Sequence, residues 1–60
     1  MNKHRAKEIM ESPTIVNVTY GGVPIYIQSV DEANEMARIY PLDEPNKEQD
    51  VPLSNLIEQE

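Results

Sequence analysis

A two-residue glycine loop constrains the fold of this chain more than any other feature. Gly21-Gly22 separates two runs rich in β-branched and aromatic residues, positions 15–20 and 23–28. A Gly-Gly loop readily adopts the positive φ angles of a type I′ turn, which joins antiparallel strands tightly. The sequence therefore predicts a β-hairpin centred on these glycines.

The loop length also sets the expected register of the hairpin. Three cross-strand pairs share one face and form its expected core: Tyr20 with Val23, Val18 with Ile25, and Val16 with Ile27. The opposite, mostly polar face carries Ile15, Asn17, Thr19, Pro24, Tyr26 and Gln28. A slip of one residue would mix the two faces, so the pattern favours this register.

Pro24 is compatible with this register. Thr19 and Pro24 form a non-hydrogen-bonded pair, so the missing N–H of Pro24 points away from the first strand. Proline is confined to strand positions whose N–H has no ladder partner. We therefore expect the far side of the second strand to be an exposed edge at Pro24.

Residues 2–12 predict a short amphipathic helix ahead of the hairpin. Ala6, Ile9 and Met10 form its apolar stripe, and Pro13 ends it. A helix of this length is marginal in water, so it needs the sheet to dock on.

The remainder of the chain alternates polar segments with short apolar runs. The expected elements are a polar turn at 31–35, a strand at 36–40, a charged loop at 43–48, a strand at 50–53, a helical turn at 54–57 and a solvated tail at 58–60. Asn34 is the turn residue expected to take a left-handed conformation. Pro52 suggests an edge strand, and Leu56 is expected in the core.

These elements predict a mainly β (α+β) fold in a single small domain, residues 1–60. A short N-terminal helix (2–12) precedes a four- to five-stranded antiparallel meander (14–57). A small SH3-like barrel and an open meander with the helix across one face both fit the pattern. With 60 residues and no cysteine, the domain has no disulfide to stabilise it. A second copy could cover an exposed strand edge, so a homodimer is one expected assembly.

The charge of the chain argues against a nucleic-acid partner. Eleven acidic residues outnumber five Lys and Arg, for a net charge of −6. Phosphate-backbone binding depends on clustered basic residues, and the one basic cluster, residues 3–7, is followed by acids. Apolar runs are too short to span a membrane or to form a secretory signal, so we expect a cytoplasmic protein with no membrane partner.

The residues carry no recognisable catalytic, metal or cofactor site, and we expect no enzyme activity and no cofactor. Carboxylates are calcium ligands, and four acids lie in or beside the charged loop: Asp43, Glu44, Glu48 and Asp50. Their spacing matches no EF-hand. His4 is the one candidate base and lies near the terminus. The candidate nucleophiles, Ser12, Ser29 and Ser54, are nucleophiles by residue type alone.

An exposed apolar surface is the best functional candidate. Tyr26 falls on the outer face of the hairpin, beside Ile15, and Pro24 marks the expected edge. An outward aromatic can bind a peptide or stack on a base. We therefore predict Tyr26, Pro24 and Ile15 as an interaction surface, with a protein partner or a second copy favoured over nucleic acid.

Long ordered stretches of the chain resemble the H-type small, acid-soluble spore proteins of endospore-forming bacteria. The stretches that carry the resemblance are residues 5–13, 16–20, 22–27, 37–42 and 49–56. The resemblance implies synthesis in the forespore during sporulation and residence in the spore core. Relatives tend to have Asn-Gly where this chain has Asn34-Glu35. The chain contains no phenylalanine, so it lacks the Glu-Phe-Ala type of site that the germination protease cuts in the abundant spore proteins.

The resemblance and the absence of recognisable catalytic groups together predict a non-enzymatic spore-core protein. Its expected role is that of a structural or protein-interaction module. Two alternatives stay open: a weak nucleic-acid binder, and an amino-acid store that is degraded on germination.

The substitution Gly21→Val tests the predicted hairpin. A β-branched residue strains a turn that requires positive φ, so we expect the free energy of unfolding to fall by about 1–2 kcal/mol. Thermal unfolding measures the change. An unaltered melting temperature would show that the turn lies elsewhere.

Overall fold

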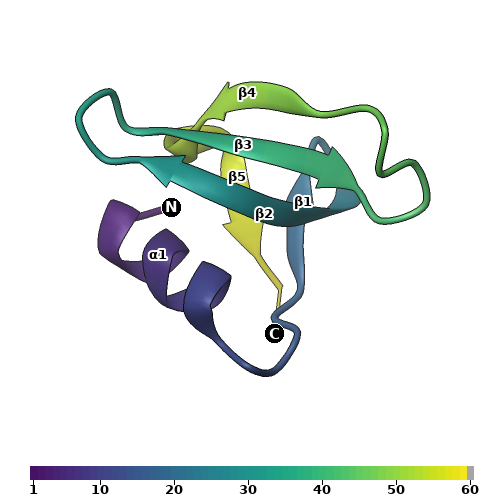
Figure 1. The fold of residues 1–60 in the computed structure, drawn as a ribbon, viewed down its shortest axis with the longest axis horizontal. Coiled ribbons are helices and arrows are strands. Elements are labelled where there is room, and N and C mark those ends of the chain that lie inside the picture. The colour runs from purple at the N-terminus through teal and green to yellow at the C-terminus, as the bar shows by residue number, and fades with distance from the viewer. Residues whose placement is uncertain (60) are drawn as a thin grey trace.

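The structure is a computed structural model that describes residues 1–59. One helix, α1 (Lys3–Glu11), precedes the strands. These are β1 (Val18–Tyr20), β2 (Val23–Asp31), β3 (Met36–Pro41), β4 (Gln49–Pro52) and β5 (Leu56–Glu58), with a 3-10 turn at Leu53–Asn55. The predicted class, a short N-terminal helix followed by a mainly β antiparallel meander, is confirmed (Figure 1).

The strands form one antiparallel sheet in the order β4-β3-β2-β1-β5. β1 to β4 follow one another as a meander, and the 3-10 turn then returns the chain so that β5 lies beside β1. In Figure 1, β1 and β5 run across the direction of β2, β3 and β4, so the sheet curls strongly. β4 and β5 remain its two edges. The sheet is a curled half-barrel, between the closed barrel and the open meander.

The glycine hairpin is confirmed in position and register. Gly21 and Gly22 both have positive φ, 57° and 81°. β1 pairs with β2 as Val18 with Ile25, Thr19 with Pro24, and Tyr20 with Val23. A two-residue loop with positive φ at both positions is the type I′ geometry that matches the twist of the strands.

The first strand is shorter than predicted. β1 begins at Val18 rather than at Ile15, so the expected pair of Val16 with Ile27 does not form. The chain reaches β1 from the end of α1, which packs against β2 (Figure 1). Before Val18 the backbone instead contacts the C-terminal segment, where the Gln59 N–H donates to the Asn17 carbonyl at 2.8 Å.

The core lies between the curled sheet and α1. Its buried residues are Ala6, Ile9, Val18, Ile25, Ile27, Ala37, Ile39, Val51, Leu53 and Leu56. Met10, Val16 and Tyr20 pack against this core and are half-buried. Val23 was predicted in the core but is 46% exposed. It lies at the hairpin tip, beyond Ile25, where the pairing of β2 with β3 ends.

The two strand prolines differ in position. Pro52 lies in β4, an edge strand, as predicted. Pro24 does not mark an edge, because β2 lies between β1 and β3. Its carbonyl accepts a hydrogen bond from the Leu42 N–H at 3.3 Å, so β2 has a neighbour on that side. A proline fits there because it is near the start of β2, where the ladder with β3 is ending.

The turn between β2 and β3 places its strain on a different residue from the one predicted. Glu35, not Asn34, has positive φ, at 52°. Asn34 instead bonds to Asp31: its N–H donates to Oδ1 at 3.2 Å and its Nδ2 donates to Oδ2 at 2.9 Å. Asn34 makes these bonds without adopting positive φ, and the next residue, Glu35, takes the left-handed conformation instead.

The helix docks on the sheet as expected. Ala6 and Ile9 are buried. Asn2 caps the helix, because its Oδ1 accepts a hydrogen bond from the His4 N–H at 2.7 Å. The Met1 amino group donates to the Leu53 carbonyl at 2.7 Å, which joins the helix start to the 3-10 turn. None of the helical segments within residues 1–59 has the length and apolar character needed to cross a membrane.

The C-terminal region differs from the predicted helical turn and tail. The helical turn comes one residue earlier, at Leu53–Asn55, and residues 56–58 form β5. Leu56 is in the core, as predicted. Glu58 belongs to β5 rather than to a solvated tail, and Glu60 lies outside the described residues.

The substitution Glu35→Gly tests the strain at the turn. A non-glycine residue pays a steric cost at positive φ that glycine does not, so we expect the free energy of unfolding to rise by about 1 kcal/mol. Chemical denaturation measures the change. Glu35→Ala is the matched control, because it removes the charge but keeps the Cβ, and it should give no comparable gain. Equal stabilisation by both variants would mean that charge, not backbone strain, sets the effect.

Candidate interaction surface

A mostly apolar groove of about 190 Å³ lies between the chain that follows α1 and the first half of β2. We call it the Tyr26 groove. Residues of the 12–17 segment form one wall, and residues of β2 form the other, with Leu42 from the β3–β4 connection beside them. In the described part of the chain its lining contains no charged side chain. Such a surface can take an apolar side chain.

The three residues predicted as an interaction surface all line this groove. Ile15 is 83% exposed and comes from the segment before β1, whereas Pro24 and Tyr26 come from β2. Tyr26 is 42% exposed. The structure thus brings the three side chains to one concave surface, and a role in binding stays a prediction.

Leu42 is an exposed residue of this surface that the sequence analysis did not select. It is 52% exposed and lines the groove from the far end of β3. A leucine between Pro41 and an acidic loop gave no local signal. Its place in the groove depends on β3 lying beside β2, which brings the Leu42 N–H to the Pro24 carbonyl.

Tyr26 is held in place by a ring on the neighbouring strand. Its ring centroid lies 5.4 Å from that of Tyr40, with the planes tilted by 35°. The two residues are cross-strand partners in the β2–β3 ladder. Aromatic pairs of this geometry add stability beyond the area they bury. The ring therefore presents a partly exposed but oriented surface to the groove.

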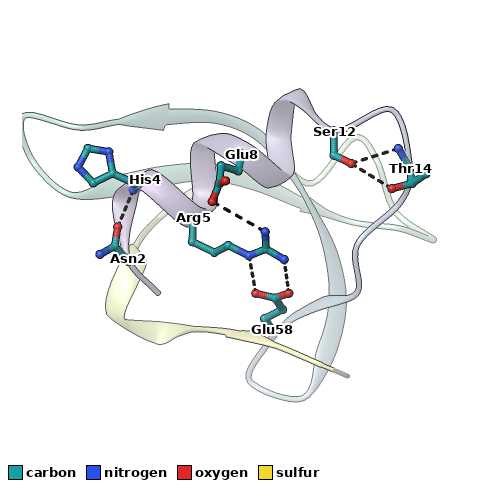
Figure 2. Close-up of polar contacts among 7 residues, drawn as sticks. All are labelled: Asn2, His4, Arg5, Glu8, Ser12, Thr14 and Glu58. Atoms are coloured by element: carbon teal, nitrogen blue, oxygen red, sulfur yellow. Dashed lines mark hydrogen bonds and ion pairs between the residues drawn. The ribbon is translucent and has the colours of Figure 1, made fainter.

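Local hydrogen bonds organise the wall formed by the 12–17 segment. The Ser12 N–H donates to the Ile9 carbonyl at 3.2 Å and ends α1. The Ser12 Oγ accepts a hydrogen bond from the Thr14 N–H at 3.2 Å and lies 3.0 Å from the Thr14 Oγ1 (Figure 2). This turn directs the chain away from the helix and toward Ile15.

Among residues 1–59, ion pairs occupy four of the five Lys and Arg side chains. The pairs are Arg5 with Glu58 at 2.6 Å, Lys7 with Glu32 at 3.6 Å, Arg38 with Glu48 at 3.1 Å and Lys47 with Glu44 at 2.8 Å. Glu11 precedes the groove wall at Ser12, and Asp43 follows Leu42. The chain on both sides of the groove therefore carries negative charge, and the net charge is −6.

Comparison with known proteins identifies the family. The profile of the small acid-soluble spore protein H family matches residues 1–58. The chain belongs to this family. A small, acid-soluble spore protein H of Bacillus licheniformis is 66% identical over 58 residues, covering 97% of this chain and 98% of the relative. Those of Halalkalibacterium halodurans and Bacillus subtilis are 67% and 62% identical over 58 residues, covering 97% of this chain and 97% and 98% of the relatives. No solved structure matches the chain.

The resemblance noted from the sequence is thus confirmed, and the chain is a spore protein of the H family. The relatives are named for their occurrence in spores and for their solubility in acid, and these names state no binding partner or reaction. A molecular role for this family member has to be argued from its surface.

The groups considered for metal binding and for a Ser–His pair can be located within residues 1–59. Among residues 1–59 no group of three or more His, Asp or Glu is placed to hold a metal ion. Of the four loop acids considered for calcium, Glu48 and Asp50 both contact Arg38, and Glu44 contacts Lys47. His4 and Ser12 lie near opposite ends of α1, about 12 Å apart along the helix axis, too far for a hydrogen bond.

A bidentate ion pair ties α1 to β5. The Arg5 Nε donates to Glu58 Oε1 at 2.9 Å, and Nη2 donates to Oε2 at 2.6 Å (Figure 2). The Arg5 Nη1 also lies 3.9 Å from Glu8. The hydrogen bonds from Arg5 lower the pKa of Glu58 below its ordinary value of 4.5. The pair therefore favours the folded state when Glu58 is ionised.

This ion pair predicts a pH-dependent contribution to stability. Because the pKa of Glu58 is lower in the folded chain, the contribution is present above about pH 4.5 and is lost as pH falls through the lowered pKa. Glu58→Gln should therefore lower the melting temperature at neutral pH, and the difference from wild type should close in acid. Thermal unfolding from pH 7 down to pH 2 measures the difference.

The control is the same substitution in an Arg5→Gln background, where the guanidinium that lowers the pKa is absent. There Glu58→Gln should change the melting temperature by a similar amount at every pH. A pH-dependent difference that persists without Arg5 would contradict the assignment.

Proposed function

We propose that this H-family protein is a non-enzymatic spore-core protein, made in the forespore, that acts by binding another protein. Family membership supports the spore setting. The Tyr26 groove supports a binding role, because its concave and uncharged lining differs from an ordinary polar surface. Ile15 is 83% exposed and so adds little buried area to the fold, yet it lies in a concave surface beside Tyr26.

A protein partner is favoured over a nucleic acid by the charges. Binding to a phosphate backbone requires Lys and Arg that are available for contacts. Most of the basic side chains here contact carboxylates of the same chain, including Arg5 and Lys7 of the basic N-terminal segment. The aromatic surface at Tyr26 is also remote in sequence from that segment, and the groove lining carries no basic residue within residues 1–59.

The non-enzymatic part of the proposal rests on the arrangement of reactive side chains. General acid–base chemistry requires titratable groups held together in a protected cleft. Within residues 1–59 the groove lining carries no charged side chain, and most acids of the charged loop are bonded to Arg38 or Lys47. A surface of this kind binds an apolar segment more readily than it performs a reaction.

The proposal predicts that the protein accumulates in the forespore and retains a protein there. A C-terminal affinity tag leaves the Met1 amino group free for its hydrogen bond to Leu53. Capture from sporulating cells should recover a partner that survives nuclease treatment. The matched control is the same tagged protein produced in vegetative cells, which should not retain that partner.

Three results would contradict this function. Steady accumulation in vegetative cells would remove the sporulation role. Salt-sensitive binding of labelled DNA or RNA that accounts for the captured material would favour the nucleic-acid alternative. Complete loss of the intact protein on germination, with no partner captured at any stage, would favour an amino-acid store.

A further inference from the structure

Two tyrosine rings lie beside each other on the face of the sheet that is turned away from the core. β2 and β3 run side by side (Figure 1), and Tyr26 and Tyr40 are cross-strand partners in their ladder. The ring centroids are 5.4 Å apart, and the planes are tilted by 35°. Opposed side chains on neighbouring antiparallel strands have Cβ atoms about 4.5–5.5 Å apart, so the ladder itself holds the two phenol rings together.

The tyrosine pair can be reached from solvent. The strand neighbours of these tyrosines, Ile25, Ile27 and Ile39, face the core and are at most 4% exposed. Alternation turns the tyrosines to the opposite face, where Tyr26 is 42% exposed and Tyr40 is half-buried. A small oxidant in solution can therefore contact the pair.

The composition of the chain directs one-electron oxidation to tyrosine. Tyrosine, tryptophan and cysteine are the side chains that lose a single electron most easily, and this chain contains no tryptophan and no cysteine. Its three methionines react with peroxide by oxygen transfer to sulfur, which forms a sulfoxide. A single electron removed from this chain therefore comes from a tyrosine.

The third tyrosine is placed apart from the pair. Tyr20 belongs to β1, packs against the core and is half-buried. Within residues 1–59, Tyr26 and Tyr40 form the only pair of aromatic rings in contact. Tyr20 therefore has no neighbouring ring in the described part of the chain with which it could couple.

We propose that Tyr26 and Tyr40 are a site of oxidative modification, at which hydrogen peroxide and a one-electron catalyst such as a haem peroxidase join the two rings as dityrosine. Each phenol loses one electron and one proton, which gives two tyrosyl radicals. A carbon–carbon bond forms between one ortho carbon of each ring. The C–H bonds at these two carbons then break as their protons move to the phenol oxygens. The two electrons and two protons removed first reduce the peroxide to two molecules of water.

The arrangement of the rings favours coupling within one chain. The reacting ortho carbons lie at the edges of rings whose centroids are already 5.4 Å apart. The ring torsion of tyrosine has a broad energy minimum, and exposed side chains change rotamer rapidly. Rotation of the side chains can therefore bring one ortho carbon of each ring together while the strands keep their register.

Concentration and charge both disfavour coupling between two copies. A ring fixed on the neighbouring strand acts at an effective concentration far above that of a second molecule in dilute solution. The net charge of −6 also makes two copies repel each other at low ionic strength. The expected product is therefore a monomer with an internal link.

The link fastens β2 to β3 by a covalent bond. It closes the segment 26–40, which contains the turn with positive φ at Glu35. A cross-link between neighbours of the folded state restricts the unfolded chain, as a disulfide does. The linked protein should therefore have a higher melting temperature than the unmodified protein.

The test exposes the purified full chain, in dilute low-salt solution, to hydrogen peroxide and a haem peroxidase. The expected product migrates as a monomer, has lost two hydrogen atoms by mass spectrometry and shows dityrosine fluorescence. Trypsin cuts after Lys7, Arg38 and Lys47, so digestion of the product should yield residues 8–38 joined to residues 39–47.

Three phenylalanine variants locate the link. Tyr26→Phe and Tyr40→Phe keep the packed rings but remove the phenol that is oxidised, so each should lose the linked monomer. Tyr20→Phe is the matched control and should retain it. In that control residues 8–38 contain one tyrosine, so their link to residues 39–47 can only join Tyr26 to Tyr40. Oxidation in denaturant should sharply lower the yield, because the ladder no longer holds the rings together.

Four results would overturn the proposal. Covalent dimers as the main product, a linked monomer retained in Tyr26→Phe or Tyr40→Phe, or an equal yield in denaturant would show that the β2–β3 ladder does not direct the coupling. Methionine sulfoxide as the only change would show that the pair does not react. The proposal rests on ring geometry and on composition, so these results leave the protein-binding function to its own capture experiment.

Discussion

The burial of Ile25 and Ile27 along β2 is the interaction on which the rest of the structure depends. β2 is the longest strand, and β1, β3 and α1 all pack directly on it. Alternation places these two isoleucines on the inner face, where Ile9 of the helix and Ile39 of β3 belong to the same buried cluster. A chain of 60 residues without a disulfide has little other apolar area to bury, so each element is positioned by its contact with this strand.

The parts of the fold that follow from local chemistry could be predicted from the sequence. Gly21-Gly22 specifies a turn and a register by itself, and the helix shows its own cap, stripe and stop. Glu35 could not be assigned, since either turn residue can take positive φ and the choice depends on the bonds that Asn34 makes to Asp31. β5 was also missed, because a three-residue strand has no pattern apart from the strand it pairs with.

The candidate surface was predictable only in part, because it too depends on contacts between segments that are distant in sequence. Tyr26 was found because alternation along β2 assigns it to the outer face, whereas Ile15 was assigned to that face by a strand that in fact begins only at Val18. Leu42 joins them through the pairing of β3 with β2, a contact between segments that are distant in sequence. Pro24 was selected as an edge residue and proved to be interior, yet it still lines the groove, so its position was found for the wrong reason.

The groove results from a conflict between two ways of burying apolar side chains. Extending β1 to Ile15 would complete the ladder with β2, whereas docking α1 buries Ala6 and Ile9 and brings the chain to β1 from the helix. The Ser12–Thr14 turn and the Gln59 bond to Asn17 hold the second arrangement. The core gains the helix and the sheet loses one pair of backbone partners. A groove beside the end of the β1–β2 ladder is therefore a consequence of how this small chain completes its core.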